Sequence, residues 1–243
     1  MSGISNDILA VLSTVEISGH NVKIVDQLDR MLYLAVNDVL VRIGGKWNRK
    51  AKAHVFSVEP AARLEAVMNS GQLDPKIKTG YFPTPEIIVK QMIELLELQQ
   101  GNTTLEPSAG QGHIADFLPK DNLIVGEILP ENRHVLQEKG YAIAIEDFLK
   151  SEGMKVDRII MNPPFEKQAD IEHIMKAISC LNNGGILVSV MSSGVLFRNN
   201  KKTQQFRDDV LDYAEIIPLP EGSFKESGTM VNTILVKIRK EAT

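Results

Sequence analysis

Residues 159–165 read Ile-Ile-Met-Asn-Pro-Pro-Phe, and the rest of the chain is best interpreted outward from this stretch. The apolar run that ends at Met161 indicates a buried strand, and the Asn-Pro-Pro-Phe that follows marks the loop at its end. Neither proline has a backbone N–H and both have a fixed φ, so the loop is stiff and its carbonyl oxygens need partners from outside. The stretch therefore predicts a rigid loop with one amide, Asn162, and one ring, Phe165. The carbonyl acceptors and the ring of such a loop suit a planar molecule that bears an exocyclic amino group.

Short apolar runs alternate with helical patterns from residue 84 onward. The predicted strands are residues 104–106, 123–127, 142–145, 158–161, 186–191, 214–218 and 231–238. This alternation predicts an α/β fold, a doubly wound and mostly parallel sheet with helices on both faces. Such sheets bind ligands beyond the carboxyl ends of their strands. The last two strands lack a convincing helix between them, so the final strand is expected to run antiparallel. A helix with Thr84 as its N-cap and Pro85 in its first turn is expected to run to about residue 98.

The first 79 residues predict a small α-rich region. Apolar residues recur at helical spacing in residues 4–15, 28–43 and 60–68, and short strands are expected near His20 and His54. Polar residues, Pro75 and Gly80 place the boundary within residues 74–80. The expected domains are therefore residues 1–79 and 80–243.

The composition excludes several classes of protein. One cysteine, Cys180, cannot form a disulfide framework within the chain, so a cytoplasmic location is expected. No apolar run approaches the ~20 residues that span a bilayer, so no membrane association is expected. The five histidines form no metal-ligand pattern, and no metal is expected.

A basic stretch follows the second predicted helix. Residues 39–58 hold five Lys/Arg and no acid, although the net charge of the chain is −4. A solvated loop is the ordinary interpretation of such a run. Basic groups interleaved with an aromatic also suit a phosphate backbone and a stacked base. The candidate nucleic-acid contacts are Lys46, Trp47, Arg49 and Lys50.

The first strand of the predicted sheet is followed by a glycine-rich turn, since residues 105–112 read Leu-Glu-Pro-Ser-Ala-Gly-Gln-Gly. Gly110 and Gly112 allow a tight turn and close approach of the backbone to a ligand. With Ala115 they also fit the dinucleotide fingerprint, so a nicotinamide or flavin enzyme is an alternative. Glu106 argues against it, because a carboxylate there repels a pyrophosphate and attracts an ammonium or sulfonium group.

Two further acids end the next two strands. Glu127 lies where an acid would hold ribose hydroxyls. Asp147 offers an acceptor for an adenine amino group, and Phe148 is either a ring that stacks on adenine or a core residue. Contacts to an amine, a ribose and an adenine, in that order along the chain, favour S-adenosylmethionine over NAD.

Together these motifs resemble those of the amino-methyltransferases. The resemblance rests on Tyr81-Phe82-Pro83-Thr84-Pro85, residues 105–112, Glu127, Asp147-Phe148 and Asn162-Pro163-Pro164-Phe165. It is closest to the adenine-N6 DNA methyltransferases in which the cofactor motifs precede the catalytic one. It covers roughly residues 80–240 and implies a seven-stranded Rossmann-like sheet with a reversed last strand. Residues 44–50 resemble a stretch found ahead of methyltransferase domains carried on phages and mobile elements.

The resemblance also implies site residues. Those expected to bind S-adenosylmethionine are Tyr81, Thr84, Pro85, Glu106, Pro107, Ser108, Gly110, Gly112, Glu127, Ile128, Asp147, Phe148 and Asn162. The catalytic residues are Asn162, Pro163, Pro164 and Phe165. Phe165 and Phe224 are expected to stack on the two faces of a base that has been flipped out of the duplex.

The implied reaction is methyl transfer to the exocyclic N6 of adenine in DNA, as in restriction–modification enzymes. Alternatives are adenine in RNA, the glutamine side chain of a protein, or a non-catalytic nucleic-acid-binding or anti-restriction module with the same fold. Little room for a recognition region remains after residue 165. A second basic group, formed by Arg198, Lys201 and Lys202, is expected either to meet phosphate or to begin a solvent-facing helix.

Overall fold

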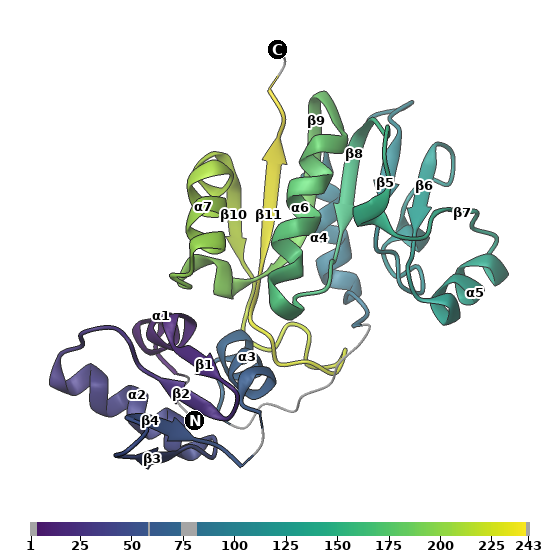
Figure 1. The fold of residues 1–243 in the computed structure, drawn as a ribbon. Helices are drawn as coiled ribbons and strands as arrows, with labels where there is room; N and C mark the ends of the chain where they lie inside the picture. The colour runs from purple at the N-terminus through teal and green to yellow at the C-terminus, as the bar shows by residue number, and fades with distance from the viewer. Residues whose placement is uncertain (1–3, 58, 74–81, 242–243) are drawn as a thin grey trace.

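The computed structural model describes residues 4–57, 59–73 and 82–241, which form an N-terminal unit and a larger sheet domain (Figure 1). We call residues 4–73 the N-terminal unit and residues 82–241, which hold the residues expected to be catalytic, the catalytic domain. The expected boundary at 74–80 and the candidate residue Tyr81 lie outside the described residues. In the described ranges no helix is both long enough and apolar enough to cross a membrane.

The catalytic domain is built on a seven-stranded sheet of order β10-β11-β9-β8-β5-β6-β7. Its strands are β5 (Thr104–Glu106), β6 (Leu123–Gly126), β7 (Ile143–Ile145), β8 (Val156–Met161), β9 (Leu181–Ser192), β10 (Glu215–Pro218) and β11 (Thr233–Arg239). Only β11 runs antiparallel to its neighbours, β9 and β10. The sequence-based expectation of seven strands with a reversed last one is confirmed.

Helices cover both faces of this sheet. They are α4 (Glu86–Leu96), α5 (Pro130–Glu138), α6 (Ala169–Cys180) and α7 (Lys201–Asp209), joined by the 3-10 turns η1 (Ala115–Phe117), η2 (Phe148–Lys150), η3 (Glu166–Gln168), η4 (Ser193–Leu196) and η5 (Leu211–Tyr213). Side chains alternate between the faces along β8. Ile159 and Met161 join the core beneath α6, and Ile160 joins the core beneath α4. Because both faces are buried here, the second half of β8 is apolar, which is why residues 159–161 read as a continuous apolar run.

The connectivity of the sheet creates a crevice at one edge. β5 pairs with β6 on one side and with β8 on the other. The chain therefore leaves β5 and β8 in opposite directions across the sheet, which is the switch point where doubly wound folds bind ligands. Glu106 ends β5 and Asn162 follows β8.

The N-terminal unit has its own core and its own sheet. It contains α1 (Asn6–Thr14), β1 (Glu16–Ser18), β2 (Asn21–Lys23), α2 (Arg30–Arg42), β3 (Lys46–Asn48), β4 (Ala53–Val55) and α3 (Ala61–Ser70). The antiparallel sheet has the order β1-β2-β4-β3. The three helices were expected, but the four-stranded sheet is more β-structure than the sequence indicated. The basic stretch forms a hairpin, β3–β4, whose three-residue strands are too short to show a clear alternation.

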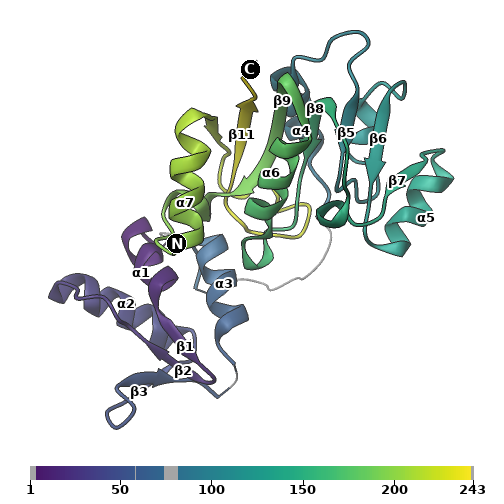
Figure 2. The same ribbon diagram turned by 45° about the horizontal axis from the view of Figure 1, so that its top comes forward.

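The N-terminal unit lies at the carboxyl ends of the parallel strands. In Figure 1, α1 and α3 lie below α7 and the sheet, and in both views β3 lies at the end of the unit away from the sheet (Figure 2). Asn69, near the end of α3, bonds to Ser192, the last residue of β9. The unit therefore sits on the same edge of the sheet as the switch point.

Candidate functional site

A small pocket lies at the carboxyl ends of β5 and β8. We call it the central pocket, and it is lined by Phe82, Thr84, Glu106, Ser108, Ala109, His113, Ile114 and Asn162. The strands β5 and β8 are neighbours in the sheet, so two motifs 56 positions apart in the sequence face one another. Glu106 and Asn162 were expected to act at one site, and the structure brings them together.

Asn162 is oriented by the segment before α4. Its Nδ2 donates to Thr84 Oγ1 at 3.0 Å and to the Phe82 carbonyl at 3.3 Å. Its Oδ1 is buried and has no partner among the described residues. The amide is therefore fixed with its acceptor free. Thr84 was expected to cap α4, but α4 begins one residue later with Pro85 at its N-cap. The Thr84 hydroxyl holds the Asn162 amide instead.

Glu106 is the second acceptor in the central pocket. It is 1% exposed, and its Oε2 has no partner in the described parts of the chain. Burial raises the pKa of the Glu106 carboxyl well above its usual range, and the nearby carboxylate of Asp116 raises it further. A cation beside this carboxyl would favour its charged form. An ammonium group would supply both the missing donor and the compensating charge.

The glycine turn is tied to the next strand by Glu127. Gly110 has φ +57° and Gly112 has φ +88°, a conformation that favours glycine. Glu127 is buried, and its carboxylate accepts from Gly110 N and Leu129 N, both at 2.7 Å. Each carboxylate oxygen has a second acceptor position. The sequence analysis missed Gly126, where an added Cβ would lie 3.0 Å from the Pro107 carbonyl oxygen.

Of the residues expected to contact an adenine ring, one is exposed, one is paired with a lysine and one is buried. Ile128 is an exposed apolar side chain beside Glu127. Asp147 pairs with Lys150 at 2.8 Å, and the hydrogen bond from Lys150 lowers the pKa of its carboxyl. Phe148 is 4% exposed and packs in the core near the His173 ring. The expectation that Phe148 stacks on a ligand therefore fails in this structure, and its alternative as a core residue holds.

The segment of residues 162–168, which we call the catalytic segment, follows β8. Pro163 is buried, Pro164 is exposed and Phe165 is half-buried. Lys167 and Gln168 both have left-handed backbone angles, with φ +53° and +60°. Phe224, expected on the opposite face of a flipped base, is fully buried in the core with α4. Its ring has no free face, because the segment between β10 and β11 folds it inward.

The basic residues expected to contact nucleic acid lie on the β3–β4 hairpin. Lys46, Arg49 and Lys50 are exposed, and none pairs with an acid in the described chain. Trp47 is 47% exposed, with its ring 5.2 Å from the His54 ring, edge to face. His54 is buried and bonds to Asn37 of α2 at 2.9 Å. The hairpin is thus anchored while its charged side chains face outward.

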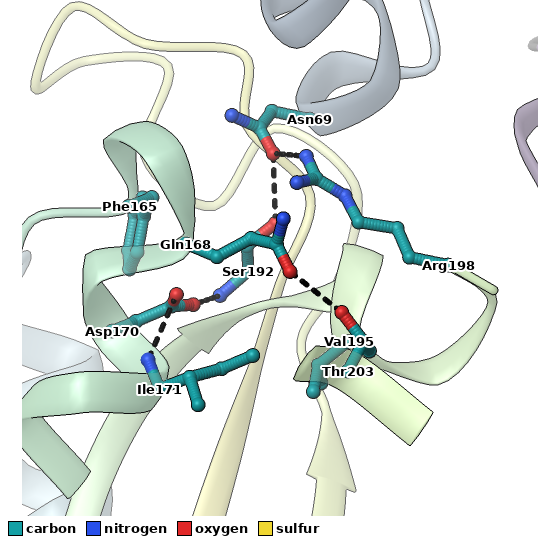
Figure 3. Close-up of a pocket in the computed structure, with 9 residues that line it drawn as sticks. All are labelled: Asn69, Phe165, Gln168, Asp170, Ile171, Ser192, Val195, Arg198 and Thr203. Atoms are coloured by element: carbon teal, nitrogen blue, oxygen red, sulfur yellow. Dashed lines mark hydrogen bonds between the residues drawn. The ribbon is translucent and has the colours of Figure 1, made fainter. Parts of the chain in front are cut away.

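A second small pocket, which we call the junction pocket, lies between α3 and the catalytic segment (Figure 3). It is lined by Asn69, Phe165, Gln168, Asp170, Ile171, Ser192, Val195, Arg198 and Thr203. Arg198 neither meets phosphate nor faces solvent, because it is 3% exposed and bonds to Asn69 and Glu65. The helix expected at this basic group does begin at Lys201, which is exposed. The polar residues of this pocket, each isolated in an apolar or helical pattern, escaped the sequence analysis.

Comparisons with known proteins agree with this geometry. The profile of a family described as N-6 DNA Methylase matches residues 113–243, more than half of the chain. The methylase subunit of the type I restriction enzyme StySPI from Salmonella potsdam is 24% identical over 228 residues, covering 70% of this chain and 42% of that protein.

Solved structures share the fold. The modification subunit of a type I restriction enzyme from Vibrio vulnificus superposes with a TM-score of 0.55 at 20% identity, covering 74% of this chain and 49% of that one. The M protein of the type I restriction enzyme EcoKI gives a TM-score of 0.55 at 19% identity, covering 96% and 56%. The chain spans about half the length of these relatives. A class I S-adenosylmethionine-dependent methyltransferase from Listeria monocytogenes also superposes, with a TM-score of 0.54 at 14% identity over 76% of this chain and 69% of that one. The catalytic domain therefore has a Rossmann-like methyltransferase fold.

Proposed function

Because the chain belongs to the N-6 DNA methylase family, we propose that it transfers a methyl group from S-adenosylmethionine to the exocyclic N6 of adenine in DNA. The observation that carries the proposal is the pair of buried acceptors in the central pocket, Glu106 Oε2 and Asn162 Oδ1, neither of which has a partner among residues 4–57, 59–73 and 82–241. An unpaired buried acceptor costs about 1–3 kcal/mol. Two in one pocket are explained if ligands bring the missing donors.

The residues of the pocket fit S-adenosylmethionine. Glu106 would accept from its ammonium group, and Glu127 would accept from the ribose hydroxyls with the lone pairs that Gly110 and Leu129 leave free. Ile128 would cover the adenine ring, and Asp147 would accept from its amino group. Ser108 and the glycine turn border the methionine end. When bound, this cofactor supplies an activated methyl group.

Asn162 and Pro163 would act on the base that receives the methyl group. The N6 lone pair of adenine is delocalised into the ring, so the nitrogen is a poor nucleophile. Acceptance of its two hydrogens by Asn162 Oδ1 and the Pro163 carbonyl would favour a tetrahedral nitrogen and stabilise its developing positive charge. The stiffness of Pro163-Pro164 keeps these oxygens in position. Phe165 would stack on one face of the base.

We assign the β3–β4 hairpin to the nucleic-acid substrate. Three unpaired cations and a half-exposed Trp47 ring suit phosphate contacts and a stacked base. Among the described residues, the N-terminal unit is therefore the part that we assign to DNA contacts outside the target base.

The test is a comparison of substrates. The protein is incubated with S-adenosylmethionine labelled in its methyl group and with duplex DNA, single-stranded DNA, RNA or a protein extract. Mass spectrometry of nucleosides and peptides then locates the label. N6-methyladenine in DNA supports the proposal. Label only in RNA or on glutamine selects one of the other amino-methyltransferase reactions, and no label with any substrate contradicts the proposal.

A further inference from the structure

We propose that Asn69 of the N-terminal unit is a positioning residue for the catalytic segment, through the buried hydrogen bonds of the junction pocket. This inference rests on the proposed function for its catalytic meaning. Asn69 lies in α3 and is 6% exposed. It does not line the central pocket, so its effect on that site must pass through other residues.

Hydrogen bonds lead from Asn69 through Ser192 to Asp170 and Ile171 in α6, the helix that directly follows the catalytic segment (Figure 3). Asn69 Oδ1 accepts from Ser192 Oγ at 3.1 Å. The backbone N–H of Ser192 donates to Asp170 Oδ2 at 3.1 Å, and Asp170 Oδ1 accepts from Ile171 N at 3.1 Å. Asp170 stands in the first turn of α6, which begins directly after Gln168. Because all of these groups are buried, water cannot readily replace a lost partner.

Arg198 also donates a hydrogen bond to the Asn69 side chain. Its Nη2 donates to Asn69 Oδ1 at 2.6 Å and to Glu65 Oε1 at 3.0 Å, both on α3. The guanidinium fits because Gly194 has no side chain, since a Cβ there would lie 2.9 Å from Arg198 Nε. A buried charge that loses its partners is strongly destabilising. Helix α3 therefore cannot leave this position without exposing or unpairing Arg198.

The catalytic segment needs such support. Lys167 and Gln168 are consecutive left-handed residues with side chains, a conformation unfavourable for L-residues. Gln168 is held by α7, through Thr203 Oγ1 to Gln168 Oε1 at 2.6 Å and Lys202 Nζ to the Gln168 carbonyl at 2.9 Å. The ring of Phe165 lines the same pocket. Strain of this kind persists only where the surroundings hold it, so loosening the junction pocket should free Phe165 and the residues after it.

The experiment measures hydrogen–deuterium exchange of the full-length protein, together with methylation of DNA. The variants are Asn69→Ala, which removes the shared acceptor, and Gly194→Ala, which displaces Arg198 without altering α3. Asn182→Ala is the matched control, because it removes one side-chain hydrogen bond, to Asp157 at 2.8 Å, at the opposite end of β9.

We expect roughly tenfold faster exchange in residues 165–172 of Asn69→Ala and Gly194→Ala, with exchange in residues 187–191 unchanged. Asn182→Ala should exchange like the wild type. The kcat for DNA should fall about tenfold in the first two variants, while the Kd for S-adenosylmethionine stays constant.

Unchanged exchange in residues 165–172 of Asn69→Ala overturns the inference, whatever the activity. Faster exchange across the whole sheet also overturns it, because the effect is then global destabilisation. A wild-type protein that methylates nothing removes the proposed function, but the exchange result still decides whether Asn69 positions the segment. The two failures are therefore separate.

Discussion

The central pocket and the junction pocket lie at the same edge of one sheet, yet they differ in whether their buried polar atoms have hydrogen-bond partners. In the central pocket the Oε2 of Glu106 and the Oδ1 of Asn162 have no partner. In the junction pocket Asn69, Asp170, Ser192 and Thr203 are all hydrogen-bonded, and only the Nε of Arg198 is left over.

This difference separates a pocket that is suited to bind ligands from a pocket that fixes the positions of the helices and strands around it. Buried polar groups in native proteins are nearly always paired. A cluster of unpaired acceptors is therefore evidence for ligands that donate, whereas a saturated cluster fixes the elements that contribute to it. Each of the following predictions tests one side of this comparison.

The largest effect is expected from Asn162→Ala. Loss of a preorganised group that stabilises transition-state charge lowers kcat by about 10²–10³-fold, while S-adenosylmethionine should bind within about threefold of wild type. Single-turnover methylation and titration calorimetry measure the two quantities. Asn162→Asp keeps an acceptor and should retain more activity than the alanine variant. Equal activity of Asn162→Ala and wild type would refute the assigned role.

Glu106→Gln should weaken S-adenosylmethionine binding about 100-fold, since a buried charge-assisted hydrogen bond is lost. The pH dependence follows from the raised pKa of Glu106. The carboxyl must release its proton to accept an ammonium group, so the affinity of the wild type should rise with pH below that pKa. Calorimetry in buffers of different ionisation enthalpy should detect proton release in the wild type. The same release in Glu106→Gln would assign the proton to another group.

In the junction pocket the effect should appear in stability. Burial raises the pKa of Asp170 to about 6, despite the opposing influence of Arg198 and Lys202. Because the folded state holds this proton more tightly than the unfolded state, whose pKa is about 3.9, the contribution of Asp170 to stability is fully present below about pH 4 and is lost as pH rises through about 6. The decline should be about 2–3 kcal/mol. Urea unfolding of wild type and Asp170→Asn at pH 4.5 and 7.5 tests this, with a smaller decline expected in the variant. Parallel declines would contradict it.

The smallest effect is expected at the β3–β4 hairpin, where the charges remain in water. Changing Lys46, Arg49 and Lys50 together to alanine should weaken DNA binding about 10-fold and reduce the slope of log K against log salt by up to about 3. Fluorescence anisotropy across a salt series measures both. The folded state should be unaffected, because the three side chains are exposed. An unchanged slope would instead support the interpretation of the hairpin as a solvated segment.

Much of the fold was predictable because it depends on repeated local patterns. Strand β5 was predicted with its observed limits, and β8 within two residues of them, because the buried apolar run of residues 159–161 stands out in the sequence. Glu106 and Asn162 drew attention because they stand at the ends of those strands. The prediction that Thr84 caps α4 was wrong, because its hydroxyl accepts from the Asn162 amide instead.

The aromatic and basic candidates were harder to assign. Phe148 and Phe224 read as possible stacking rings, but both are buried. Arg198 read as an exposed cation, but α3 covers it. The residue type is the same whether an aromatic ring or a guanidinium packs in a core or contacts a ligand. Only the groups that pack against the side chain distinguish the two cases. That depends on contacts between segments more than 100 residues apart.

The sequence by itself determined the alternation of strands and helices, the stiffness of Asn-Pro-Pro-Phe and the order of the cofactor motifs, because these depend on neighbouring residues and on backbone chemistry. Only the tertiary structure decided which acceptors are left without partners, which aromatic rings are buried and that α3 is tied to the catalytic segment. Those properties depend on burial, and burial is set by which distant elements meet at one edge of the sheet.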